Sequence, residues 1–77
     1  MTEFDNLKNT YISVIQWGLN SKVGYIECKR GNDILHKFCD KLIENCNYST
    51  TEKEAMKNEL DCVKYSLSKE IENYYIG

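Results

Sequence analysis

The sequence of 77 residues contains no proline, only one histidine and no long apolar run. A membrane-spanning helix needs about 20 consecutive apolar residues, so the sequence predicts no membrane span. The N-terminus, Met-Thr-Glu-Phe-Asp, is acidic and lacks the apolar stretch of a signal peptide. We therefore expect a cytoplasmic protein whose four cysteines are reduced, namely Cys28, Cys39, Cys46 and Cys62.

Motifs of enzyme chemistry are missing as well. The sequence has no phosphate-binding loop, no nucleophile elbow and no closely spaced pair of zinc-binding histidines. Nothing near His36 in the sequence is arranged as an activated nucleophile, and the cysteines lack the close pairs typical of zinc sites. The sequence predicts a protein that is not an enzyme, with no catalytic residue, metal ligand or cofactor.

The net charge of −2 argues against a protein that binds duplex nucleic acid. The charge is unevenly distributed, because residues 21–37 carry a net charge of +2 whereas residues 38–77 carry −3. A basic segment of this size suits one or two phosphates rather than a duplex.

Hydrophobic periodicity predicts an all-α fold in a single domain. We expect an N-terminal helix over residues 3–19, a connector over residues 20–31 and an antiparallel helical hairpin over residues 32–76. Thr2 is the expected N-cap of the first helix and Asn32 that of the second. Two overlapping capping boxes, Ser49–Glu52 and Thr51–Glu54, place the start of the third helix near Thr50. Within the connector, residues 21–31 could form a strand, a loop or an early helical turn.

Each helix of the hairpin has an apolar stripe that should face the core. The stripe of the first consists of Ile34, Leu35, Phe38, Cys39, Leu42, Ile43 and Cys46, and that of the second of Met56, Leu60, Val63, Leu67, Ile71 and Tyr74. The N-terminal helix contributes Phe4, Leu7, Tyr11, Val14 or Ile15, and Trp17 or Leu19. A chain this short has a thin core, and nothing covers Tyr74, Tyr75 and Ile76, so we expect a homo-oligomer.

Aromatic residues close to cations suggest a binding site between the first helix and the hairpin. A nucleobase can stack on an aromatic ring while lysine or arginine holds a phosphate. The candidate ligand-binding residues are Tyr11, Trp17, Lys22, Tyr25, Lys29 and Arg30. Alternatively, Tyr11 and Trp17 belong to the core and the cations are solvated.

The hairpin also resembles a known family. The residues that carry the resemblance are Leu-Ile-Glu-Asn-Cys (42–46), the polar Ser-Thr-Thr-Glu (49–52), the segment from Glu52 to Asp61, and then Val63 and Ile71. Over residues 34–71 the chain is similar to small phage anti-CBASS proteins, whose helical hairpin is shared with an anti-Thoeris sponge. These proteins sequester the cyclic nucleotide signals of bacterial defence. Their base-stacking N-terminal segment has no counterpart here, so the six candidate residues are chosen by residue type alone.

The resemblance implies a non-enzymatic phage protein that sequesters a cyclic oligonucleotide in the host bacterial cytoplasm. Its pocket would form between subunits of a homo-oligomer, where aromatic rings and cations converge. The alternative is a small inhibitor that binds a protein, with the acidic helical surface of residues 38–77 against a basic groove on its partner. The first function requires a hollow beside the cations of residues 22–30, and the second a convex surface without one.

Overall fold

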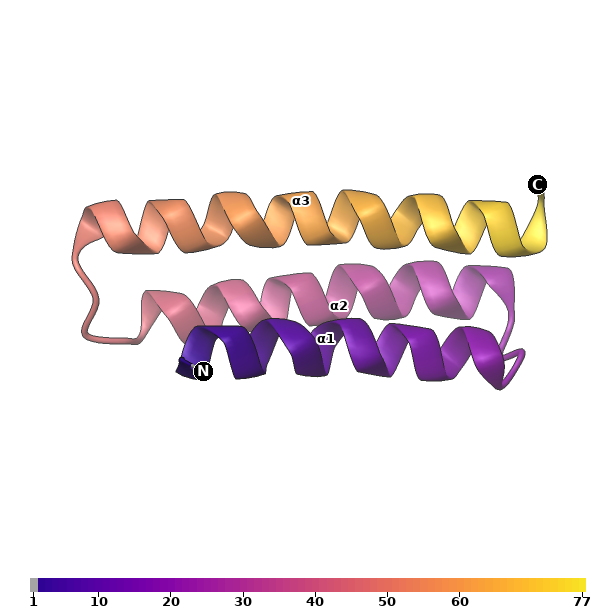
Figure 1. The fold of residues 1–77 in the computed structure, drawn as a ribbon, viewed down its shortest axis with the longest axis horizontal. Coiled ribbons are helices and arrows are strands. Elements are labelled where there is room, and N and C mark those ends of the chain that lie inside the picture. The colour runs from indigo at the N-terminus through magenta and orange to yellow at the C-terminus, as the bar shows by residue number, and fades with distance from the viewer. Residues whose placement is uncertain (1) are drawn as a thin grey trace.

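The computed structural model describes residues 2–77 and consists of three helices, α1 (Glu3–Asn20), α2 (Tyr25–Glu44) and α3 (Thr50–Tyr75). The helices run antiparallel to one another in chain order and form an elongated bundle with extents of 40 × 18 × 17 Å (Figure 1). Residues 2–77 contain no strand, so the predicted all-α fold with a helical hairpin is confirmed. None of these helices combines the length and the hydrophobicity needed to cross a membrane.

Two of the predicted helix starts are confirmed by their caps. The Thr2 hydroxyl accepts a hydrogen bond from the Asp5 backbone N–H at 3.1 Å, and the Asp5 carboxylate accepts one from the Thr2 N–H. Ser49 and Glu52 form the same reciprocal capping box at the start of α3. Each box satisfies N–H groups that the first turn of a helix leaves without a partner.

The start of α2 differs from the prediction. The connector comprises only residues 21–24, and residues 25–31 form the first two turns of α2. Gly24 occupies the N-cap position with φ of 126°, in a region of backbone conformation that is open almost only to glycine. Its N–H donates to the Tyr75 hydroxyl at 2.9 Å, so the end of α3 fixes the start of α2. Asn32 is therefore not an N-cap, and it lies buried in the middle of the helix.

The buried core lies along the line where the three helices meet. It consists of Phe4, Tyr11, Ile15 and Leu19 from α1, Cys28, Cys39 and Ile43 from α2, and Leu60, Leu67 and Ile71 from α3. The alternatives in α1 are thus resolved in favour of Ile15 and Leu19 over Val14 and Trp17. All four cysteines are free, with Cys28 and Cys39 buried and Cys62 exposed.

The predicted stripe of α2 is correct for Cys39 and Ile43, which are buried, and for Leu35, which packs against the core, but it is wrong for three of its members. Ile34, Phe38 and Leu42 are 65%, 52% and 42% exposed, respectively, whereas Asn32 is 1% exposed. The helix begins seven residues earlier than predicted, and its inward face consists of Cys28, Asn32, Cys39 and Ile43. On α3, Tyr74 is also exposed, and Tyr75 is the residue that packs against the core.

Candidate functional site

Tyr11, the first of the predicted ligand-binding residues, belongs to the core. Its side chain is 1% exposed, and its hydroxyl donates to Asn32, whose backbone oxygen lies at 3.1 Å and whose side-chain oxygen is also in contact. The Asn32 amide in turn donates to the Lys64 backbone oxygen at 3.0 Å and to the Ser68 hydroxyl at 3.1 Å. Burial raises the pKa of Tyr11 well above its usual value. This ring joins the three helices and cannot stack on a ligand, so the alternative that placed it in the core is confirmed.

Tyr25 and Lys29 lie together, as predicted, but they face α3. The Lys29 ammonium lies 5.4 Å from the centre of the Tyr25 ring and 3.3 Å from the Glu72 carboxylate. The Tyr25 ring packs edge-on against Tyr75, with the ring centres 6.1 Å apart. Interactions with the Tyr25 side chain and the Glu72 carboxylate raise the pKa of Lys29. Tyr25 and Lys29 therefore belong to the contact between α2 and α3, and the Glu72 carboxylate already neutralises the charge of Lys29.

The remaining three predicted residues lie on different parts of the bundle. Trp17 is 66% exposed on α1 and lines a shallow hollow on that helix with Asn6, Asn9, Thr10, Ser13 and Val14. Lys22 lies in the α1–α2 turn with φ of 56°, and Arg30 is exposed on α2. None of the five hollows described for residues 2–77 is lined by Lys22, Tyr25, Lys29 or Arg30. The structure thus does not bring the six residues together.

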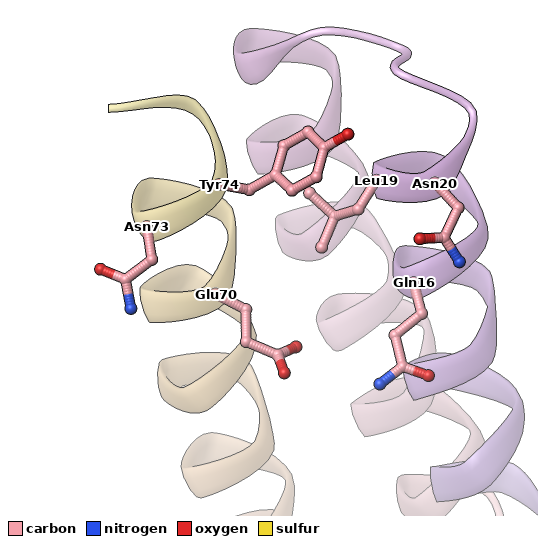
Figure 2. Close-up of a pocket in the computed structure, with 6 residues that line it drawn as sticks. All are labelled: Gln16, Leu19, Asn20, Glu70, Asn73 and Tyr74. Carbon is pink, nitrogen blue, oxygen red and sulfur yellow. The ribbon is translucent and has the colours of Figure 1, made fainter. Parts of the chain in front are cut away.

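The largest of these hollows, about 560 Å³, lies between the C-terminal ends of α1 and α3. Figure 2 shows its six lining residues, with Gln16 and Glu70 pointing into the space between the two helices and Tyr74 beside Leu19. Its only charged side chain is the carboxylate of Glu70. This hollow is unsuited to a phosphate, because like charges repel and no cation lines it.

The strongest candidate site is instead the outer face of α2, which we define as Arg30, Ile34, Lys37, Phe38, Lys41 and Leu42. All six side chains are exposed. Ile34, Phe38 and Leu42 follow one another at intervals of four residues, so they form a single row along the helix. Lys37, Phe38, Lys41 and Leu42 line an open hollow of about 430 Å³ together with Asn45.

The charge on this face is not neutralised by the rest of the protein. Three acidic residues of α2 are engaged elsewhere: Asp33 contacts Lys64, Asp40 contacts His36 and Glu44 contacts Lys57. Within residues 2–77, no carboxylate lies within ion-pair distance of Arg30, Lys37 or Lys41. The outer face of α2 therefore presents three cations beside three apolar side chains.

The sequence contains the apolar pattern of this face, but the pattern predicts that these residues face the core. Spacings of four residues from Ile34 to Leu42 predict one stripe, and periodicity alone does not distinguish a stripe that packs inward from one that stays exposed.

Comparison of the chain with family models, with curated proteins and with solved structures finds no match.

Proposed function

We propose that the chain is a non-enzymatic binding protein that docks on a partner protein through the outer face of α2. The observation that carries the proposal is the row of Ile34, Phe38 and Leu42, which is exposed while Asn32 is buried on the same helix. A helix enters an apolar groove of another protein through apolar anchors that recur about once per turn, and this row has an anchor on each of three successive turns. The proposed mode is thus docking of a preformed helix face, without coupled folding.

The charges indicate the chemistry of the partner. Lys37 and Lys41 lie beside the apolar row, and Arg30 lies one turn before Ile34. These cations favour a groove with carboxylates at its rim. A second copy of the same face is a poor partner, because a two-fold axis near its centre would oppose Lys37 and Lys41 with lysines of the other copy. The proposed function is therefore the inhibitor alternative of the sequence analysis, with a basic apolar face on α2 in place of an acidic surface.

Site-specific photo-crosslinking tests this proposal. A photoreactive phenylalanine analogue at position 38 should crosslink one protein of the native host, and the same analogue at Tyr65 should not. Tyr65 is the matched control, because it is a 65% exposed aromatic residue next to a lysine on a different helix. The purified partner should then bind the unmodified chain and lose affinity at least tenfold for Phe38→Ala, with no such loss for Tyr65→Ala. Equal effects of the two substitutions would contradict docking through α2.

A second candidate function is the sequestration of a cyclic oligonucleotide, and the hollow beside Phe38 favours it. The ring of Phe38 lines the same hollow as Lys37 and Lys41 and offers a stacking surface next to two phosphate-binding cations. The hollow is open, so a second copy would have to close it. In that assembly the phosphates of the ligand would neutralise the lysines that otherwise oppose one another, and the assembly agrees with the homo-oligomer expected from the sequence. The resemblance of residues 34–71 to the sponge family supports the same function.

Calorimetry with a panel of cyclic di- and trinucleotides distinguishes the two functions. A sponge binds one of them tightly, releases it intact on heating and loses it in the Lys37→Ala/Lys41→Ala variant. A Lys53→Ala/Lys69→Ala variant removes the same charge from α3 and is the control. No binding of any cyclic nucleotide would exclude this second function and leave protein docking in place.

A further inference from the structure

His36 lies between two carboxylates at the packed interface of α2 and α3. Its Nε2 atom is 2.7 Å from an Asp61 oxygen on α3, and its Nδ1 atom is 3.7 Å from an Asp40 oxygen one turn further along α2. One ring nitrogen and one oxygen from each carboxylate all lie within 4.8 Å of one another. The His36 side chain is only 12% exposed, so packing holds the ring in place.

This cluster carries more negative charge than its neighbours neutralise. Lys57 and Lys64 are the lysines nearest to Asp61 along α3, but they contact Glu44 and Asp33, respectively. Across residues 2–77, no lysine or arginine lies within ion-pair distance of Asp40 or Asp61. A neutral imidazole has one N–H and can donate to only one of the two carboxylates. The other carboxylate then has no positively charged or hydrogen-bonding partner from the histidine.

Asp40 has one oxygen without a partner, although its side chain is 32% exposed and the oxygen that lies near His36 is Oδ2. The Oδ1 atom of Asp40 is buried and has no hydrogen-bond partner among the described residues. Leaving a buried polar atom without a partner costs about 1–3 kcal/mol, and more for a charged group. Native structures rarely contain such an atom unless an ion or a water satisfies it.

We propose that His36, Asp40 and Asp61 bind a divalent transition-metal ion that links α2 to α3. One imidazole nitrogen with two carboxylates is a donor set that suits Zn²⁺ or Co²⁺, whereas Mg²⁺ and Ca²⁺ prefer oxygen donors alone. No metal ligand was expected from the sequence, because Asp61 on α3 is 25 residues from His36 and joins His36 and Asp40 of α2 only through the contact between the two helices. The site goes beyond the proposed function and depends on no residue of the outer face of α2.

Binding of an ion requires the side chains to move. Asp61 contacts Nε2 and Asp40 contacts Nδ1, so one carboxylate has to shift toward the ring nitrogen that the ion occupies. Two tetrahedral ligands at about 2.0–2.1 Å from an ion lie roughly 3.3 Å apart, so the contact of 2.7 Å between His36 and Asp61 has to open by about half an ångström. The Asp61 side chain is 63% exposed and is free to move by this amount. Water would complete the coordination on that exposed side.

Zinc titration of reduced protein without an affinity tag tests the site. Cys46 and Cys62 are the two cysteines that are not buried, so the titration uses a Cys46→Ser/Cys62→Ser background to remove competing thiolates. His36 is the only histidine, so its ring signals in the NMR spectrum report directly on the site. We expect binding of one Zn²⁺ per chain by calorimetry, a shift of the His36 ring signals that saturates at the same ratio, and a rise in the melting temperature.

Variants separate this site from adventitious binding. His36→Gln, Asp40→Asn and Asp61→Asn should each weaken Zn²⁺ binding at least tenfold, since even the loss of an outer-shell partner costs about 10–100-fold. Asp33→Asn is the control, because it removes the same charge from the same helix outside the cluster, and it should bind Zn²⁺ like the background protein. Circular dichroism should show the same helix content in all variants. Absence of Zn²⁺ binding to the background, or equal binding by Asp61→Asn, would overturn the proposal.

Discussion

The hydrogen bond between Tyr11 and Asn32 provides the sharpest test of the packing. Both side chains are 1% exposed, and the Tyr11 hydroxyl is the donor that satisfies the Asn32 side-chain oxygen. Tyr11→Phe removes this donor without removing the ring, so it leaves a buried acceptor unpaired. The expected loss in the free energy of unfolding is about 1–3 kcal/mol. For a domain of this size each kcal/mol lowers the melting temperature by roughly 4–8 °C.

Urea unfolding followed by circular dichroism measures this loss, with Tyr65→Phe as the control. The control removes an exposed hydroxyl from a 65% exposed ring and should change the free energy of unfolding by less than about 0.5 kcal/mol. A double-mutant cycle then isolates the pair. Asn32→Leu alone should also destabilise the protein, but Tyr11→Phe/Asn32→Leu should cost less than the sum of the two, because replacing both partners leaves neither unpaired. Strict additivity, or a negligible effect of Tyr11→Phe, would refute the described contact.

Three further predictions concern pH, the start of α2 and its outer face. The pKa of Tyr11 is raised in the folded state, so its contribution to stability is fully present below the unfolded pKa of about 10 and is lost as the pH rises above that value. The free energy of unfolding measured with urea should therefore fall less between pH 10 and 12 in Tyr11→Phe than in the unmodified protein. Gly24→Ala should lower the free energy of unfolding by about 1–3 kcal/mol in the same assay, since φ of 126° strains any residue with a Cβ atom. The control is Ser66→Ala at an exposed position, and an equally small loss in both variants would contradict this backbone conformation. Phe38→Ala should leave the free energy of unfolding within about 1 kcal/mol of the unmodified protein, whereas Leu60→Ala should cost about 2–5 kcal/mol, and equal losses would place Phe38 in the core.

The sequence was sufficient to predict the existence of the helices and most of their ends. The ends of α1 and α3 depend on local chemistry, such as the Ser49–Glu52 capping box, and local chemistry can be read from the chain. The start of α2 depends on a contact with a residue 51 positions away, where the Gly24 N–H donates to the Tyr75 hydroxyl. Glycines on both sides of residues 25–30 also suggested an irregular segment, and packing of Cys28 in the core favoured a helix instead.

The functional residues were also predicted incorrectly because they depend on contacts between helices. In the sequence, Tyr11 precedes a basic segment and has the residue type of a ligand-binding residue. In the structure its hydroxyl contacts Asn32, and only the bundle brings these two residues together. His36, Asp40 and Asp61 likewise become one cluster only when α2 and α3 are antiparallel. Residue type and spacing identified aromatic rings and cations, but which of them remain exposed depends on the rotation of α2.

That rotation is itself an argument for a binding function of α2. Burying a side chain the size of Ile34, Phe38 or Leu42 completely stabilises a protein by about 1.5–3 kcal/mol, so leaving three of them exposed in one row forgoes several kcal/mol. The same helix places Asn32 in the core, where it is stable only because Tyr11 and α3 satisfy its hydrogen bonds. The helix has apolar residues on two faces, and the bundle buries only the face of Cys28, Cys39 and Ile43. Conflicts of this kind between a local pattern and a fold concentrate at functional surfaces, and here they converge on one helix. A partner that covers the outer face of α2 would recover the apolar burial that the bundle leaves unused.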